Sequence, residues 1–127
     1  MLRLMLNQVP QIAAPHPPHI LQIFFPLLPI YGDLEIETNF KTLAADICEY
    51  VKANPVSWEM GTLEAGQLLS RCHNHSLIEL NRAVYELYAE QHDASIWCCK
   101  SMASLYYIPQ IEESGLRPIY IHLVRWT

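Results

Sequence analysis

Two cationic residues stand at the ends of apolar runs in the last third of this chain of 127 residues. Residues 95–99 precede Lys100, a helical stretch follows, and a second apolar run over residues 119–124 precedes Arg125. This order is typical of a β-strand, a crossover helix and a second, parallel strand. Ligands of open parallel sheets bind beyond the carboxyl ends of the strands, so we expect Lys100 and Arg125 to face one site. Two fixed cations suit an anion such as phosphate or sulfate.

Two histidines follow another predicted strand near the amino terminus. Residues 11–14 form a short apolar run that the prolines of Pro15-His-Pro-Pro-His end, and residues 1–8 have the apolar spacing of a helix tail. His16 and His19 therefore lie in the loop at the carboxyl end of this strand. An imidazole can take the proton of an acceptor hydroxyl near neutral pH, so either residue is a candidate general base. A loop histidine without a catalytic role is the simpler alternative.

Helices must connect and cover these strands. The apolar spacing predicts an apolar helix or helical turn over residues 20–28, an amphipathic helix over 39–53 and a short helix around 63–69. Ser76, with Glu79 three residues later, is the start signal known as a capping box, and the stripe after it predicts a helix ending near residue 91. The amphipathic helix is expected to bury Phe40, Leu43, Ala44, Ile47 and Val51. Helices between parallel strands indicate the α/β class.

The segment between the second and third predicted strands begins at Ser101. This serine has two candidate roles, because its hydroxyl can cap the following helix or donate a hydrogen bond to a phosphate. Pro109 must kink or restart that helix, since proline lacks the backbone N–H that a helix interior needs. Gly115 stands where a left-handed carboxyl cap belongs.

Several segments, in their order and spacing, resemble one protein family. They are Trp97-Cys-Cys-Lys-Ser, a helix with Leu105 and Ile108, Tyr120-Ile-His-Leu-Val-Arg, and the amino-terminal Leu2-Arg-Leu-Met-Leu-Asn-Gln-Val-Pro-Gln-Ile-Ala-Ala-Pro. The first three are similar to the central segment of the P-loop sulfotransferases, and the last resembles the helix after that family's phosphate loop and the strand beyond it. These enzymes transfer a sulfuryl group from 3′-phosphoadenosine 5′-phosphosulfate to a hydroxyl or amine.

The resemblance assigns roles to individual residues. Lys100 corresponds to the lysine that contacts the transferring sulfuryl group and the bridging oxygen, and Arg125 to the arginine that grips the cofactor's 3′-phosphate. Ser101 is a further candidate ligand of the cofactor. His16 and His19 occupy the loop in which the family places a catalytic base, commonly a glutamate. The co-substrate implied is therefore 3′-phosphoadenosine 5′-phosphosulfate, with Lys100, His16 and His19 as candidate catalytic residues.

The resemblance also implies a fold: a partial, three-layer P-loop sulfotransferase-like α/β domain with a short parallel sheet flanked by helices. We expect residues 1–127 to be a single truncated domain whose first strand and phosphate loop lie upstream of Met1. The sequence contains no Gly-rich loop that would cradle the phosphosulfate with backbone N–H groups. We therefore expect sulfuryl transfer as the ancestral reaction, with the chain as given inactive or incomplete. The acceptor, a small molecule or a peptide, is not predicted.

Composition limits the partners. The net charge is −5 and the Lys and Arg residues are scattered, so we exclude a nucleic-acid polymer. The apolar run over residues 20–30 is far below the ~20 residues that a membrane span requires, and the amino-terminal run is too short for a signal peptide. A cytoplasmic location is expected. The four cysteines lack the spacing of a disulfide framework, and the cluster Cys72-His-Asn-His lacks a second ligand pair, so we predict no metal site.

One alternative belongs to a different functional class. Charged residues are 17% of the chain, against a usual ~25%, and hydrophobic residues are 51%. Such a chain has little charged surface to cover its apolar side chains. A parallel strand without a neighbour exposes backbone groups that can pair with another chain. The alternative is therefore a non-catalytic protein-interaction module or remnant, which self-associates through an exposed sheet edge.

Overall fold

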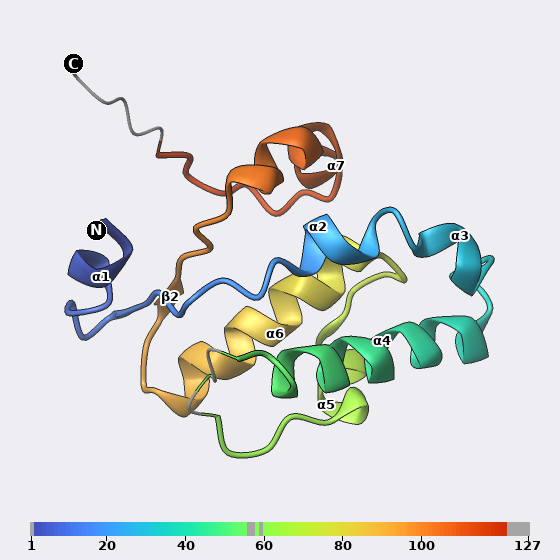
Figure 1. Cartoon of the computed structure of the whole chain (residues 1–127), viewed down its shortest axis with the longest axis horizontal. Helices are drawn as coiled ribbons and strands as arrows, with labels where there is room; N and C mark the ends of the chain where they lie inside the picture. Colours follow the sequence, from blue (N-terminus) through green and yellow to red (C-terminus); the bar gives the residue numbers. More distant parts are fainter. Residues whose placement is uncertain (1, 56–57, 59, 122–127) are drawn as a thin grey trace.

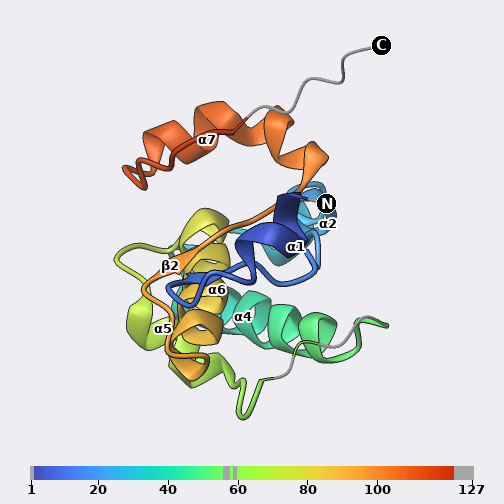
Figure 2. The same ribbon diagram turned by 90° about the vertical axis from the view of Figure 1, so that its left-hand side faces the viewer.

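Helix α6 is the element around which the rest of the structure packs. The computed structural model describes residues 2–55, 58 and 60–121. Its elements, in chain order, are α1 Leu2–Leu6, β1 Ile12–Ala13, α2 Ile20–Phe24, α3 Leu28–Tyr31, α4 Glu37–Lys52, α5 Ala65–Arg71, α6 Leu77–Gln91, β2 Ile96–Trp97, the 3₁₀-helix η1 Met102–Tyr107 and α7 Ile108–Glu113. Figure 1 shows α6 crossing the middle of the molecule, with α2 on one side and α4 and α5 on the other. Figure 2 shows η1 and α7 together at one end of the molecule, where the Tyr107 ring of η1 stacks on Phe25, directly after α2, with centroids 4.4 Å apart.

The amino end of α6 begins where the sequence predicts. The Ser76 hydroxyl accepts a hydrogen bond from the Glu79 backbone N–H at 3.2 Å, which satisfies one of the unpaired donors of the first turn. The return bond of a capping box is missing, because the Glu79 carboxylate turns to Arg82 instead. A complete capping box, formed by Glu64 and Gln67, does stand at the start of α5. The sequence analysis missed it, since glutamate is not among the preferred capping residues.

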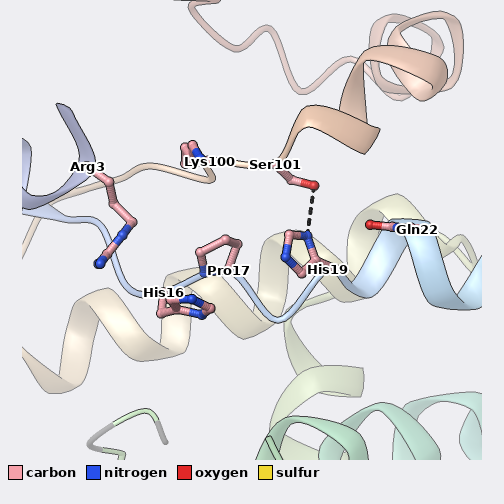
Figure 3. A pocket seen from close by; sticks show the side chains of 7 residues that line it. All are labelled: Arg3, His16, Pro17, His19, Gln22, Lys100 and Ser101. Carbon is pink, nitrogen blue, oxygen red and sulfur yellow. Dashed lines mark hydrogen bonds between the residues drawn. The ribbon is translucent and has the colours of Figure 1, made fainter. Parts of the chain in front are cut away.

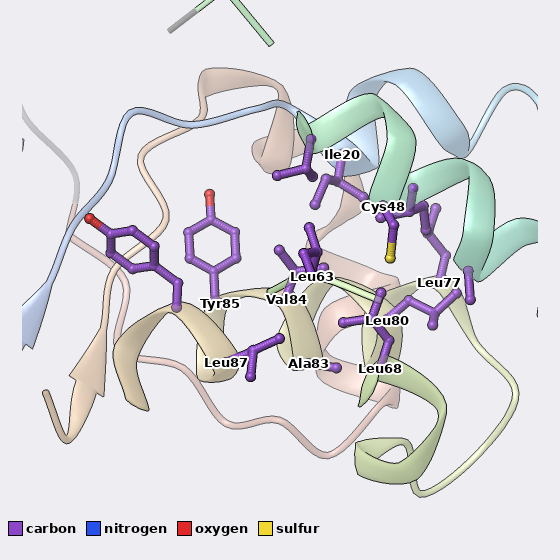
Figure 4. Packing of buried hydrophobic residues seen from close by; sticks show 14 of the residues in the cluster. Ile20, Cys48, Leu63, Leu68, Leu77, Leu80, Ala83, Val84, Tyr85 and Leu87 are labelled. Carbon is purple, nitrogen blue, oxygen red and sulfur yellow. The ribbon is translucent and has the colours of Figure 1, made fainter. Parts of the chain in front are cut away.

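The core lies between α6 and the helices beside it. All five residues of the predicted stripe on α4 are buried, and Cys48 lies with them. They belong to the same buried cluster as Leu80, Ala83 and Val84 of α6, which are fully buried (Figure 4). Burial of such side chains contributes about 1.5–3 kcal/mol each relative to exposure. The predicted helices over residues 39–53 and 77–91 are thus confirmed, with the expected faces inward.

A short parallel sheet joins the two halves of the chain. Strands β1 and β2 pair in parallel, with Ile12 opposite Ile96 and Ala13 opposite Trp97. The backbone N–H of Cys98 continues the ladder by donating to the Ala13 carbonyl at 2.8 Å. Helix α6 packs against both strands. The predicted strands within residues 11–14 and 95–99 are therefore present as β1 and β2, and helices with a two-stranded parallel sheet are consistent with the α/β class.

The predicted third strand, over residues 119–124, is wrong where the structure describes it. Residues 119–121 lie outside any strand, and their side chains are largely exposed. The Tyr120 hydroxyl donates to Glu112 of the preceding helix at 2.6 Å. Two left-handed residues turn the chain after α7, Gly115 with φ 78° and Arg117 with φ 52°. Gly115 is thus the predicted left-handed cap, and the apolar run beyond it pairs with no strand among the described residues.

The outer edge of β1 is covered by the segment before it. The Ile12 N–H donates to the Val9 carbonyl, and the Ala14 N–H donates to the Asn7 side-chain oxygen at 2.9 Å. The Arg3 guanidinium donates in turn to the Ala14 carbonyl at 3.0 Å. The turn after α1 therefore satisfies these backbone groups of β1 in place of another strand. Within the described part of the chain, β2 has no strand on its other side.

A buried ion pair within α6 also forms a hydrogen bond to the last residue of α5. Arg82 and Glu79 are 9% and 4% exposed and share two hydrogen bonds, of 2.7 and 3.0 Å. The same guanidinium donates to Glu86 and to the backbone carbonyl of Arg71, both at 2.6 Å. Burial alone would raise the pKa of Glu79, but the hydrogen bonds from Arg82 and from the His73 backbone outweigh it, so this pKa lies below its usual value.

Candidate anion-binding site

A pocket of about 260 Å³ opens where the loops after β1 and β2 meet. Its lining consists of Arg3, His16, Pro17, His19, Gln22, Lys100 and Ser101 (Figure 3). The two strands are parallel, so the loops leave the same end of the sheet, where α/β proteins bind their ligands. The structure therefore brings together four of the five residues proposed from the sequence. The fifth, Arg125, lies outside the described residues.

A hydrogen bond between His19 and Ser101 bridges the two loops. The His19 Nδ1 atom lies 3.2 Å from the Ser101 hydroxyl, and the residues are 82 positions apart in the chain. Ser101 occupies the N-cap position of η1, yet its side chain makes no capping bond. The Ser104 N–H donates to the backbone carbonyl of Ser101 instead. Of the two roles open to this hydroxyl, the structure excludes the cap and turns the oxygen toward the pocket.

The first loop is anchored to the core at His16. The Trp58 indole N–H donates to the His16 carbonyl at 2.6 Å. Trp58 is buried, and its ring packs edge-on against Tyr85 and Tyr88 of α6, with centroids 5.1 and 4.9 Å apart. The His16 side chain itself is exposed. A buried indole that needs a partner for its N–H thus holds the backbone of the loop in place.

Arg3 is a site residue that the sequence analysis missed. It lies on α1, and its hydrogen bond to the Ala14 carbonyl places the guanidinium at the pocket. Gln22 of α2 adds an amide on the far side of His19 (Figure 3). Both residues carry a signal that could have found them, since each is a lone polar side chain within an apolar run. A lone polar side chain within an apolar run is a candidate for binding.

The pocket has the charge of an anion site. Arg3 and Lys100 supply two permanent positive charges, and among the described residues neither forms an ion pair with an acidic side chain. Among the residues that the structure describes, no aspartate or glutamate lines the pocket. The Ser101 hydroxyl and the Gln22 amide add neutral donors beside these cations. The arrangement can therefore bind a phosphate or sulfate through charge-assisted hydrogen bonds.

His19 has a left-handed backbone, with φ 60° and ψ 41°. Glycine adopts this conformation without the steric cost of a Cβ atom, so His19→Gly should exceed His19→Ala in free energy of unfolding by about 1 kcal/mol. Urea denaturation of the two variants measures the difference. The control is the same pair at Gln22, inside α2, where glycine should be the less stable residue. A His19→Gly variant that is less stable than His19→Ala would contradict the backbone assignment.

The cluster Cys72-His-Asn-His lies apart from the pocket. The His75 ring stacks on Phe40 with centroids 4.5 Å apart, and its Nδ1 contacts the Leu34 carbonyl at 2.9 Å. His73 donates its backbone N–H to Glu79. In the part of the chain that the structure describes, no three His, Cys, Asp or Glu side chains are grouped to hold a metal ion. All four cysteines are free thiols, and burial raises the pKa of Cys72 to about 11.

Comparison of the chain with models of protein families, with curated proteins and with solved structures gave no match. None of the helices in the described ranges has the length and apolar character needed to cross a membrane.

Proposed function

We propose that this chain is a sulfotransferase-like protein that binds a nucleotide of the 3′-phosphoadenosine 5′-phosphosulfate type in the pocket between the two loops. One observation carries the proposal: Lys100, Ser101, His16 and His19, chosen from the sequence, line one pocket with Arg3 at the carboxyl ends of two parallel strands. A pocket with two cations and no acidic side chain among its described lining residues favours an anionic ligand. The proposal includes the fold, which would be part of the three-layer P-loop sulfotransferase fold. It also includes the role of Arg125, which would bind the 3′-phosphate of the nucleotide.

The residues of the pocket suit sulfuryl transfer. Negative charge grows on the phosphate oxygen of the nucleotide as its bond to sulfur breaks, and Lys100 would stabilise that charge. The guanidinium of Arg3 can donate two parallel hydrogen bonds to one anionic group. As the new bond forms between sulfur and the acceptor hydroxyl or amine, His16 or His19 would take the proton that the acceptor loses.

Titration calorimetry tests the binding step. We expect adenosine 3′,5′-bisphosphate to bind more tightly than adenosine, because only the bisphosphate carries groups for Arg3 and Lys100. Inorganic sulfate should bind weakly and compete with the bisphosphate. Added salt should weaken both anions and leave adenosine unchanged, since salt screens exposed charges. Equal affinities for adenosine and its bisphosphate would refute the proposal.

A second candidate function is a non-catalytic module that binds a second copy of this chain. Exposed apolar side chains on η1 favour it, because Leu105 and Tyr106 are 68% and 78% exposed. Apolar side chains grouped on a surface are typical of interaction sites. The open side of β2 offers backbone groups to the same partner.

Analytical ultracentrifugation tests this candidate. We expect the wild-type chain to sediment as a monomer at low concentration and as a dimer at high concentration. Leu105→Glu should weaken the dimer at least about tenfold, since a carboxylate would have to be buried in the interface. Gln110→Glu, an exposed position on α7, brings the same charge and should have little effect. A chain that stays monomeric at high concentration would exclude the interaction module.

A further inference from the structure

We infer that Ser101 and His19 are a nucleophile and its general base, and that Ser101 takes up a phosphoryl group from an activated phosphate bound in the pocket. The inference rests on the anion-binding site proposed above and adds a covalent step that the site's binding role does not require. Sulfuryl transfer to a separate acceptor needs no attack by a side chain of the protein. The two steps can therefore be tested apart.

The His19 imidazole and the Ser101 hydroxyl are in direct contact. A distance of 3.2 Å between His19 Nδ1 and the Ser101 hydroxyl oxygen lies within the range of a serine activated by an imidazole. For this role Nδ1 must accept the hydroxyl proton, so the ring's own proton resides on Nε2. Figure 3 shows the two side chains pointing toward each other from separate loops.

The Ser101 hydroxyl does not cap the helix that follows it. A serine at the N-cap of a helix normally uses its hydroxyl to accept a hydrogen bond from the first turn. Ser101 has the extended backbone of an N-cap, with φ −146° and ψ 120°, but makes no such bond. Its hydroxyl is directed to His19 instead. The oxygen that would have stabilised η1 is thereby left available for reaction.

The backbone around His19, the proposed base, is held in place by hydrogen bonds. His19 has the left-handed backbone described above, and strained residues of this kind cluster at functional sites. Its carbonyl accepts the Ile23 N–H at 3.1 Å, which ties it to α2. Three residues earlier, the indole of Trp58 fixes the loop through the His16 carbonyl. A base positioned from both sides loses little freedom when a ligand binds.

Two positive charges line the pocket with the Ser101 hydroxyl. Lys100 precedes Ser101 directly, and Arg3 lines the same pocket from α1. Cations placed in this way stabilise the oxygens of a phosphoryl group during its transfer. A volume of about 260 Å³ has room for a small phosphorylated donor. An acyl phosphate is the simplest donor class, since its carboxylate is a good leaving group.

The step balances without any further reactant. The Ser101 oxygen forms a bond to phosphorus while the bond from phosphorus to the acyl oxygen breaks. The hydroxyl proton passes to His19 Nδ1, and the carboxylate leaves with the electron pair of the broken bond. The imidazolium then releases its proton to water. The products are phosphoserine at position 101 and the free carboxylate.

The experiment uses the full chain and acetyl phosphate as the donor, with intact-mass spectrometry and peptide mapping as readouts. We expect wild-type protein to gain one phosphoryl group on Ser101. Ser101→Ala should gain none, and His19→Gln should react about 10²-fold more slowly, because it keeps a polar side chain but cannot act as a base. Two matched controls, Ser114→Ala and His92→Gln, alter residues outside the pocket and should react as wild type does.

Two comparisons keep the outcome decisive. In the wild-type spectra, Ser101 must be modified in preference to Ser114 and Ser95, so the inference is tested even if a variant does not fold. Unmodified Ser101, modification spread evenly over these serines, or a folded His19→Gln variant that reacts at the wild-type rate would each overturn it. Titration with inorganic phosphate separates the two proposals. Binding of phosphate without modification of Ser101 refutes the nucleophile and leaves the anion site standing, whereas the loss of both refutes both.

Discussion

Replacing Glu79 with glutamine is expected to lower the free energy of unfolding by about 3 kcal/mol, the lower end of the cost of breaking a buried ion pair. The variant leaves the guanidinium of Arg82, which is 9% exposed, without its main counter-charge. Glu86 and the Arg71 carbonyl still accept from it, which is why we expect the lower end. The Glu79 carboxylate also accepts the His73 N–H, and an amide oxygen is the weaker acceptor.

Urea denaturation at neutral pH measures this loss. Glu49→Gln is the matched control, because it breaks the pair of Glu49 with Lys52 on the exposed face of α4. Exposed pairs of this kind contribute about 0.2–1 kcal/mol or less. If the two variants lose the same small amount of stability, the Glu79–Arg82 pair has no special role in holding α5 to α6.

The same pair predicts a dependence on pH. In the folded chain the pKa of Glu79 is lowered, so its contribution to stability is fully present above the pKa of an unfolded glutamate, about 4.3. That contribution is lost as the pH falls through the lowered pKa of the folded state. The difference in unfolding free energy between wild type and Glu79→Gln should therefore shrink as the pH is lowered below about 4.3. A difference that stays constant into acid would contradict the ionised pair.

The second large effect is expected at the pocket. Arg3→Ala and Lys100→Ala should each weaken the binding of adenosine 3′,5′-bisphosphate by about 10- to 100-fold, since a charge-assisted hydrogen bond contributes about 1.5–3 kcal/mol. The double variant should lose measurable binding. Arg3→Lys keeps the charge but loses the planar fork of donors, so it should recover only part of the affinity.

Calorimetry at two salt concentrations checks these values. Lys41→Ala is the control, because it removes a cation of α4 that pairs with Glu37 outside the pocket. Arg3 also donates to the Ala14 carbonyl, so thermal melts must show that Arg3→Ala keeps its fold. Wild-type affinity in folded Arg3→Ala and Lys100→Ala would mean that the ligand, if bound, lies elsewhere.

Helices with a long apolar stripe could be predicted from the sequence. The positions Phe40, Leu43 and Ile47 recur with helical spacing, and each is buried in α4. Ser76 is a cap that acts within one turn, so its role depends on few other residues. The meeting of residues 16, 19, 100 and 101 could also be predicted, because the carboxyl ends of parallel strands lie at one edge.

Features that depend on long-range partners could not be predicted in the same way. An apolar run such as residues 119–121 has the composition of a strand, but whether it pairs depends on the direction in which Gly115 and Arg117 turn the chain. Glu79 fits a capping box by spacing, yet Arg82, one helical turn later, is the stronger partner for its carboxylate. Arg3 reaches the pocket only because α1 folds back along the edge of β1.

The bridge between His19 and Ser101 also has a consequence for how the chain folds. Its two residues are 82 positions apart, so the pocket forms only after a long loop has closed. Contacts of this separation form slowly relative to the local contacts within α4 or α6. During synthesis, the helical body can assemble before residues 96–101 have left the ribosome, whereas the pocket cannot. A ligand that binds only the closed pocket would therefore stabilise the finished fold and leave the nascent helices unaffected.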